Sequence, residues 1–368
     1  MAAESRPQDQ TKESFGEYLS DVQVKGFTAL GVAMGVATGL LEKMSHLDEP
    51  KSCREISEIA LLKERYVREL LGILVCGRIV DYNAASDTFF LPSHRRSFFI
   101  PGNIEHEIPI GIGHVTSLSY AVNDVRECFS PNGPRGLSNE HFSYMPEMSS
   151  LRFQHYLLDE LKDFPGLHEQ LESGIQVLDL ACGPGSASIL MAKHYPNSRF
   201  MGLDISPDVI VKAEEAAKGL PNVEFQCVSA EGLPSELSEK FDFLFIYNAI
   251  HDCFHPEKAV REAFRVLKPG AKAMIQEPYA RTKLADNAQD PSMACVYTYS
   301  LYCCLPQANI PDDAAGLGAA WGKERCQEML EGVGFKVVST KPGSGKKTWC
   351  FHCTKPENED HSAGATAH

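Results

Sequence analysis

Residues 177–185 read Val-Leu-Asp-Leu-Ala-Cys-Gly-Pro-Gly, and this stretch decides the fold. An apolar run that enters a glycine-rich turn and then a helical segment, Ser186 to His194, predicts a buried strand of an open α/β sheet. The glycines matter because a Cβ at those positions would collide with a ligand that approaches the backbone. Asp179 lies near the carboxyl end of the strand, where its carboxylate can hold a cationic group of that ligand.

From residue 175 onward, short apolar runs alternate with segments of helical periodicity. This alternation predicts a mostly parallel sheet with helices on both faces. The expected strands are 176–180, 199–203, 223–228, 241–247, 272–276, 335–340 and 348–353, and the expected helices are 186–194, 207–218, 256–267 and 323–332. We expect the last two strands to form an antiparallel hairpin that closes the sheet.

Two further loops carry side chains suited to a nucleoside. Asp204 ends the second strand, where an acidic residue accepts hydrogen bonds from ribose hydroxyls, and Ile205 follows it. We expect the loop after the third strand to lie beside the adenine of such a nucleoside, with Ala230 and Glu231 as the candidate contacts. A dinucleotide is the competing ligand, but its fingerprint needs a third glycine where this chain has serine and alanine at 186–188.

The ordered set of motifs resembles the class I S-adenosylmethionine-dependent methyltransferases over residues 174–355. It consists of Asp-x-x-Cys-Gly-x-Gly at 179–185, an acid after the second strand, and Leu-Lys-Pro-Gly at 267–270. The resemblance implies a Rossmann-like sheet and S-adenosylmethionine as the cofactor. The expected cofactor contacts are Asp179, Ala181, Gly183, Gly185, Asp204, Ile205, Ala230, Glu231 and Asn248.

The segment Asn248-Ala-Ile-His-Asp252 follows the fourth strand, where the transferred methyl group would face its acceptor. Methyl transfer from a sulfonium is a displacement in which positioning supplies most of the rate. A phenol, imidazole or amine acceptor also benefits from a general base, and histidine suits that role near neutral pH. We expect His251 to be this base. The alternative is that His251 packs against the cofactor or caps the next helix, with Asp252 as its partner.

Aromatic residues gather in the segment 280–321, which follows the fifth strand. Insertions at this place commonly close over the acceptor in this fold, although an ordinary buried helix face explains the same pattern. The expected acceptor contacts are Asp252, Tyr299, Tyr302 and Trp321, with Tyr144 from the preceding helical segment.

The first hundred residues show two helical segments, 52–60 and 63–76, followed by a hairpin pattern, which is typical of a winged helix. The motifs Asn248-Ala-Ile-His-Asp252 and Gly316-Leu-Gly-Ala-Ala-Trp-Gly322 are similar to a group in mycobacteria and animals in which such a domain precedes the methyltransferase, and this resemblance covers nearly the whole chain. Residues 51–100 contain eight basic and six acidic side chains, so they lack the concentrated positive face that DNA binding requires. The resemblance to small-molecule methyltransferases implies a homodimerisation and substrate-capping domain instead.

Composition narrows the setting. The net charge of −14 disfavours nucleic acid and anionic membrane as partners, and no apolar stretch is long enough to span a bilayer. Twelve cysteines without an export signal indicate free thiols in the cytoplasm, and no pattern among them predicts a metal site. The expected divisions are a disordered start (1–15), the winged-helix domain (16–101), a helical linker and lid (102–172), the methyltransferase domain (173–355) and a disordered tail (356–368).

Together these patterns predict methyl transfer to a small molecule bound between the catalytic domain and the helical lid. The residues do not decide whether oxygen, nitrogen or sulfur accepts the methyl group. One alternative is a DNA-associated regulator that binds the cofactor with little or no turnover. Another is a protein or RNA methyltransferase, which would have an open acceptor groove.

Overall fold

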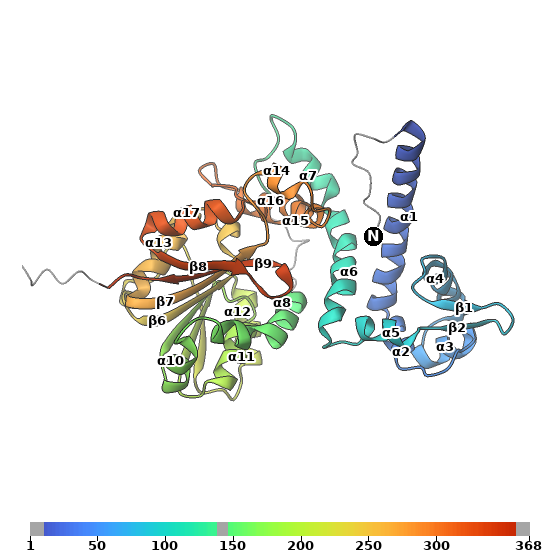
Figure 1. Ribbon diagram of the computed structural model, residues 1–368, viewed down its shortest axis with the longest axis horizontal. Helices are drawn as coiled ribbons and strands as arrows, with labels where there is room; N and C mark the ends of the chain where they lie inside the picture. Colours follow the sequence, from blue (N-terminus) through green and yellow to red (C-terminus); the bar gives the residue numbers. More distant parts are fainter. Residues whose placement is uncertain (1–10, 138–145, 358–368) are drawn as a thin grey trace, which may run out of the picture. The chain divides into compact units, whose positions relative to one another are not determined.

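The computed structural model describes residues 11–137 and 146–357, and the chain divides into two compact units, residues 1–120 and 121–368 (Figure 1). Each unit has its own apolar core. No helix within the described ranges is long and apolar enough to cross a membrane.

The first unit is helical apart from one short hairpin. Its elements are α1 (Lys12–Ala37), α2 (Leu40–Ser45), α3 (Cys53–Ala60), α4 (Glu64–Cys76), β1 (Asp81–Asn83), β2 (Thr88–Phe90), α5 (Ser93–Arg96), η2 (Ser97–Phe99), η3 (Ile104–His106) and α6 (Glu107–Tyr120). Helix α3 starts with a capping box, in which Ser52 Oγ accepts from the Glu55 N–H and the Glu55 carboxylate accepts from the Ser52 N–H. The order of α3, α4 and the β1–β2 hairpin is that of a winged helix, as the sequence predicts.

The second unit is built on a seven-stranded sheet in the order β5-β4-β3-β6-β7-β9-β8. Its strands are β3 (Gln176–Leu180), β4 (Arg199–Asp204), β5 (Val223–Cys227), β6 (Phe241–Tyr247), β7 (Leu267–Pro278), β8 (Lys336–Pro342) and β9 (Thr348–Thr354). Strands β5, β4, β3, β6 and β7 run parallel, whereas β9 pairs antiparallel with both β7 and β8. The predicted mostly parallel sheet with an antiparallel end is confirmed.

Helices cover both faces of this sheet (Figure 1). One face packs Leu178, Leu244 and Ile275 against helices α13 (Pro256–Val266) and α17 (Lys323–Val333). The other packs Val177, Phe243 and Met274 against helices α9 (Leu158–Lys162), α10 (Leu167–Ser173) and α11 (Ser186–His194). Successive strand residues point to opposite faces, which is why these strands are apolar almost throughout. The helices and turns of this unit are α7 (Val122–Cys128), α8 (Pro146–Arg152), η4 (Phe153–Leu157), α9 (Leu158–Lys162), α10 (Leu167–Ser173), α11 (Ser186–His194), α12 (Pro207–Ala216), η5 (Ser235–Leu237), η6 (Ile250–Asp252), α13 (Pro256–Val266), α14 (Leu284–Asn287), α15 (Met293–Tyr299), η7 (Ser300–Cys304), α16 (Leu305–Ala308), α17 (Lys323–Val333) and η8 (Ser344–Lys346).

Candidate functional site

The turn between β3 and α11 has three residues in the left-handed region. Ala181 has φ +60°, Gly183 +55° and Gly185 +77°. A Cβ on Gly185 would lie 2.5 Å from the ring of Phe225, so glycine is required there by packing against β5. Ala181 adopts its positive φ although it carries a Cβ, which is a strained conformation for a residue other than glycine.

Asp179 is buried at the carboxyl end of β3, with 3% of its surface exposed. Its Oδ2 accepts a hydrogen bond of 2.6 Å from Ser188 Oγ at the start of α11. Burial, with a smaller contribution from the charge of Asp204, raises the pKa of Asp179 to about 7. A cationic group placed beside this carboxylate would stabilise its ionised form and lower that pKa.

Asp204 ends the neighbouring strand β4 and holds the glycine turn in place. Its Oδ2 accepts from the Gly183 N–H and its Oδ1 from the Ser206 N–H, both at 3.0 Å. The side chain is half-buried, and each oxygen keeps a lone pair for a further donor. Ile205, next in the chain, is 65% exposed.

Glu231, expected beside an adenine, binds a histidine in this structure. Its Oε1 accepts from the His255 N–H at 2.9 Å and its Oε2 lies 2.7 Å from His255 Nδ1. His255 Nε2 in turn lies 3.1 Å from Asp313 Oδ2. The hydrogen bond to Glu231, followed by that to Asp313, raises the pKa of His255. Ala230 is half-buried in the same loop.

A second polar centre lies where β6 and β7 end, and Glu277 is at its middle. Glu277 Oε1 accepts from the Ala249 and Ile250 N–H groups at 3.0 and 2.9 Å. Its Oε2 lies 2.7 Å from His251 Nδ1 and accepts from Trp321 Nε1 at 3.0 Å. His251 and Glu277 are 3% and 2% exposed. The structure therefore fixes His251 through a buried carboxylate that the sequence prediction did not include.

The charge state of His251 follows from these neighbours. Burial opposes the imidazolium form, but the carboxylates of Asp252 and Glu277 outweigh it and raise the pKa of His251 to about 9. Asp252 Oδ1 lies 3.5 Å from His251 Nε2, and 48% of the Asp252 side chain is exposed. Nδ1 is thus held in the interior by Glu277, while Nε2 faces Asp252 on the more exposed side.

Asn248 directly follows β6, the strand that lies between β3, which leads into the glycine turn, and β7, which carries Glu277. It has φ +50°, an unusual conformation that asparagine tolerates better than most residues. Its Oδ1 is buried and accepts no hydrogen bond in the described part of the chain. A buried acceptor without a partner is costly, so a ligand that donates to it would be bound favourably.

The expected acceptor contacts are only partly brought together. Trp321 is buried and hydrogen-bonded to Glu277, so it supports the His251 centre from behind. Tyr299 ends α15 and Tyr302 lies in η7, and both are half-buried. Tyr144 lies outside the described residues.

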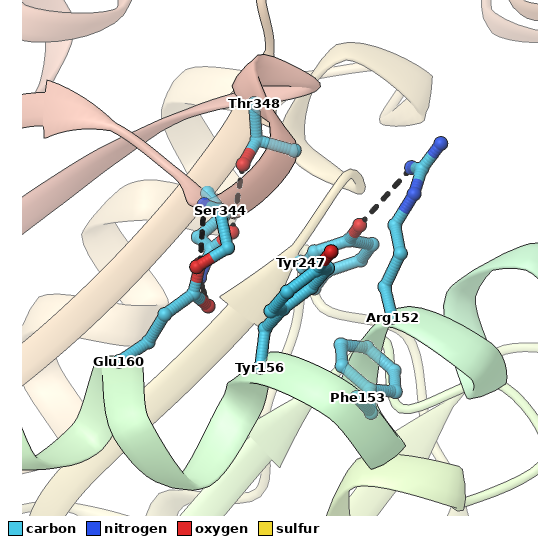
Figure 2. A pocket seen from close by; sticks show the side chains of 8 residues that line it. Arg152, Phe153, Tyr156, Glu160, Tyr247, Ser344 and Thr348 are labelled. Carbon is cyan, nitrogen blue, oxygen red and sulfur yellow. Dashed lines mark hydrogen bonds between the residues drawn. The ribbon is translucent and has the colours of Figure 1, made fainter. Parts of the chain in front are cut away.

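A small polar pocket lies on the other face of the sheet from Glu277. Figure 2 shows Arg152 and Tyr156 from the α8–η4 helix on one side of it and Thr348 from β9 on the other. Arg152 Nη1 donates to Tyr247 Oη at 3.3 Å at the end of β6. Glu160 accepts from the Ser344 N–H at 2.7 Å, so the hairpin turn is tied to α9. Sequence reasoning missed this network because its members come from four separate segments.

Comparisons with known proteins identify the two domains and the fold. Residues 171–334 match the family described as a methyltransferase domain, and residues 26–100 match the Rv2258c-like winged HTH domain. A mitochondrial 2-methoxy-6-polyprenyl-1,4-benzoquinol methylase from Caenorhabditis elegans is 36% identical over 113 residues, 29% of this chain and 39% of that protein. A trans-aconitate 2-methyltransferase from Methylobacterium nodulans is 31% identical over 122 residues, 33% of this chain and 43% of that protein. The chain thus spans about two fifths of the length of these curated relatives.

Solved structures share the fold over nearly the whole chain. Human N-acetylserotonin methyltransferase, solved with S-adenosylmethionine, superposes with a TM-score of 0.61 at 14% identity, covering 95% of this chain and 100% of that one. An O-methyltransferase family protein from Burkholderia thailandensis gives 0.64 at 13% identity, with the same coverage. Residues 171–334 thus form a methyltransferase domain with the class I fold, and an Rv2258c-like winged helix–turn–helix domain precedes it at residues 26–100.

Proposed function

We propose that this chain transfers a methyl group from S-adenosylmethionine to a small molecule that binds next to His251. The observation that carries the proposal is the buried His251–Glu277 pair at the ends of β6 and β7. It lies at the same edge of the sheet as the glycine turn, because the carboxyl ends of parallel strands meet there. A cofactor at the turn and an acceptor at His251 are thus neighbours.

The residues at the glycine turn suit this cofactor. The buried Asp179 carboxylate has no ion-pair partner within residues 11–137 and 146–357, so it matches the cofactor's ammonium group. Asp204 keeps lone pairs for ribose hydroxyls, exposed Ile205 can cover the adenine, and buried Asn248 Oδ1 can accept from a donor of the cofactor. S-adenosylmethionine, when bound, supplies an electrophilic methyl group on a positively charged sulfur.

His251 would act as the acceptor-side base. Because its Nδ1 faces the Glu277 carboxylate, we assign the Nδ1–H tautomer, which leaves the Nε2 lone pair for the proton of the acceptor. With a pKa of about 9, His251 is mostly protonated at neutral pH before ligands bind. A sulfonium nearby disfavours a second positive charge, so cofactor binding would shift His251 toward its neutral, base form.

We infer that the acceptor is enclosed by helices, as a small molecule requires. In the second unit, the loop before residue 138 is tied to the end of α16, since the Leu137 N–H donates to Pro306 O at 2.9 Å and Asn309 Nδ2 to Arg135 O at 2.8 Å. This bonding joins part of the expected lid to the segment that carries Tyr299 and Tyr302. The masking of the acceptor from water would favour methyl transfer over side reactions.

The winged-helix domain would serve dimerisation rather than DNA binding. The arginines of α4 form ion pairs on their own helix, Arg65 with Glu69 and Arg68 with Glu64, so they are poorly placed to neutralise phosphates. Helix α1 buries only small residues and Val32 of its last turns, while it exposes a row of large apolar side chains. They are Phe15, Tyr18, Leu19, Val22, Val24, Phe27, Leu30 and Met34. We propose a cytoplasmic homodimer that covers this face.

A screen for methyl acceptance tests the proposed reaction. Purified protein is incubated with S-adenosylmethionine carrying a labelled methyl group and with separate panels of small phenols, amines and thiols. Label that enters one panel, and is lost with His251→Ala, supports the proposal. Label that enters added protein or RNA but none of the small molecules would contradict it.

A further inference from the structure

We propose that His251, Asp252 and Cys304 form a binding site for a thiophilic divalent cation, with Zn²⁺ as the best fit. One ligand atom from each residue lies within 4.8 Å of the other two. The set offers one nitrogen, one oxygen and one sulfur, the three ligand types that zinc takes at about 2.0–2.3 Å. Ligand atoms on one tetrahedral zinc are roughly 3.2–3.8 Å apart. His251 Nε2 and Asp252 Oδ1, at 3.5 Å, already have that spacing.

The histidine is oriented in the way that metal-binding histidines usually are. Its Nδ1 is hydrogen-bonded to the Glu277 carboxylate, which leaves Nε2 as the ligand. Glu277 is itself held by Trp321 Nε1 and by two backbone N–H groups. The imidazole therefore does not have to be ordered when a cation arrives, which lowers the entropic cost of binding.

Cys304 is brought to this place by an irregular helix. Residues Ser300–Cys304 form a π-helical turn, a rare feature that occurs frequently at functional sites. Its neighbour Cys303 is hydrogen-bonded to Cys304, and Gln307 Nε2 also donates to the Cys303 sulfur at 3.4 Å. Asp252 is 48% exposed and gives a cation a path from solvent.

The charges around the site also favour a cation. Two carboxylates, Asp252 and Glu277, surround the imidazole, and within residues 11–137 and 146–357 neither forms an ion pair with a lysine or arginine. Binding of Zn²⁺ would release the thiol proton of Cys304 and the Nε2 proton of the His251 imidazolium, and leave a thiolate sulfur and a neutral imidazole as ligands. Three protein ligands leave the fourth position of a tetrahedral site for water.

Occupancy of this site has a consequence for catalysis, and this consequence rests on the proposed function. A cation on Nε2 uses the lone pair that would take the proton of the acceptor. Zinc should therefore inhibit methyl transfer, and a chelator should restore it. The cation site itself does not depend on the reaction and can be measured without cofactor or acceptor.

The test is a titration of the chelator-treated full chain with Zn²⁺, in competition with a chromogenic chelator, and with Co²⁺, whose thiolate complexes absorb in the near ultraviolet. The variants are Cys304→Ser and Asp252→Asn, and the matched control is Cys227→Ser, an exposed cysteine at the end of β5. We expect one site in the wild type and the control, at least tenfold weaker Zn²⁺ binding in both site variants, and loss of the thiolate absorption with Cys304→Ser.

Equal Zn²⁺ affinity in the wild type and both site variants would overturn the site, as would a thiolate absorption that persists in Cys304→Ser. Far-ultraviolet circular dichroism checks that each variant is folded. If Cys304→Ser does not fold, the Zn²⁺ affinity of Asp252→Asn still tests the site. Turnover that a loaded site leaves unchanged would contradict the proposed role of His251 as the acceptor-side base and leave the cation site standing. Failure of the wild type to bind S-adenosylmethionine would contradict the proposed function and leave the cation site standing.

Discussion

His251 Nδ1 lies 2.7 Å from Glu277 Oε2, so a residue of η6, which follows β6, and a residue near the end of β7 form one buried pair. The pair is fixed by the backbone N–H groups of Ala249 and Ile250, which both donate to the other Glu277 oxygen. A histidine held in this way can present only Nε2 to a substrate. We propose that this pair is the chemical centre of the domain, which leads to the first prediction.

Replacement of either member of this pair should reduce turnover without loss of the cofactor. We expect His251→Ala to lower the rate roughly 100-fold or more, because a positioned base typically contributes that much. Glu277→Gln should also lower it, since the amide no longer fixes the Nδ1–H tautomer. The measurement is the single-turnover rate at saturating S-adenosylmethionine, with a chelator present. Near-normal rates in both variants would assign the pair to structure.

Cofactor affinity should depend on pH through Asp179. The ordinary aspartate pKa is 3.8, and burial raises that of Asp179 to about 7. An ammonium group binds the ionised carboxylate, so affinity should rise roughly tenfold between about pH 6 and about pH 8, with release of a proton. Calorimetry in buffers of different ionisation enthalpy measures both effects. Asp179→Asn, which can still accept from Ser188, should remove the rise below about pH 7, where His251 stays protonated; an unaltered pH profile in that variant would refute the assignment.

The same raised pKa predicts how Asp179 affects stability. The folded protein keeps a proton that the unfolded chain loses, so between about pH 4 and about pH 7 the contribution of this group to the free energy of unfolding falls as pH rises. Bound cofactor should reverse that trend by stabilising the carboxylate.

Ala181→Gly should stabilise the protein. Alanine at φ +60° is strained, and glycine removes this backbone strain. The strain energy removed exceeds the cost of the extra conformational entropy that glycine loses on folding. We expect a gain of about 1 kcal/mol in the free energy of unfolding in urea. Ala181→Val is the matched comparison, because a β-branched residue should be worse than alanine at this φ. A loss of stability with glycine would show that the turn is not strained.

Much of the fold could be predicted from the sequence because local patterns determine it. Helix α11 spans Ser186–His194, as the periodicity indicates, and β3 and β6 have the predicted bounds. Strand β7 is longer than predicted, since its pairing with β6 and β9 continues on both sides of the apolar run. The apolar pattern predicts that the strand ends at residue 276, one residue before Glu277. For this reason the sequence does not predict the His251–Glu277 pair.

The side-chain partners of the site depend on tertiary structure and could not be predicted. Glu231 lies in a loop that suits an adenine, but the fold brings His255 to its carboxylate. The sequence pattern assigns Gly185 to the close approach of a ligand. In the structure, the ring of Phe225 in β5 already leaves no room for a Cβ at this position. A charged residue inside an apolar strand, such as Glu277, is the one signal that could have indicated the buried pair.

The exposed apolar face of α1 predicts self-association. Phe27 and Leu30 are 59% and 49% exposed. A double variant, Phe27→Glu with Leu30→Glu, should convert a dimer to a monomer while the fold stays intact, because charges are costly in an apolar interface. Light scattering coupled to size exclusion measures the mass. The matched control is Lys25→Glu on the same helix, and a monomeric wild type would rule out this interface.

Calorimetric titration with S-adenosylmethionine, and separately with NAD, tests the central claim most directly. The account predicts micromolar binding of S-adenosylmethionine and none of NAD. It also predicts that Asp204→Ala weakens the binding by about 1–3 kcal/mol, the effect of losing charge-assisted hydrogen bonds to the ribose. Binding of NAD alone, or of neither compound, would contradict the assignment of the glycine turn to this cofactor.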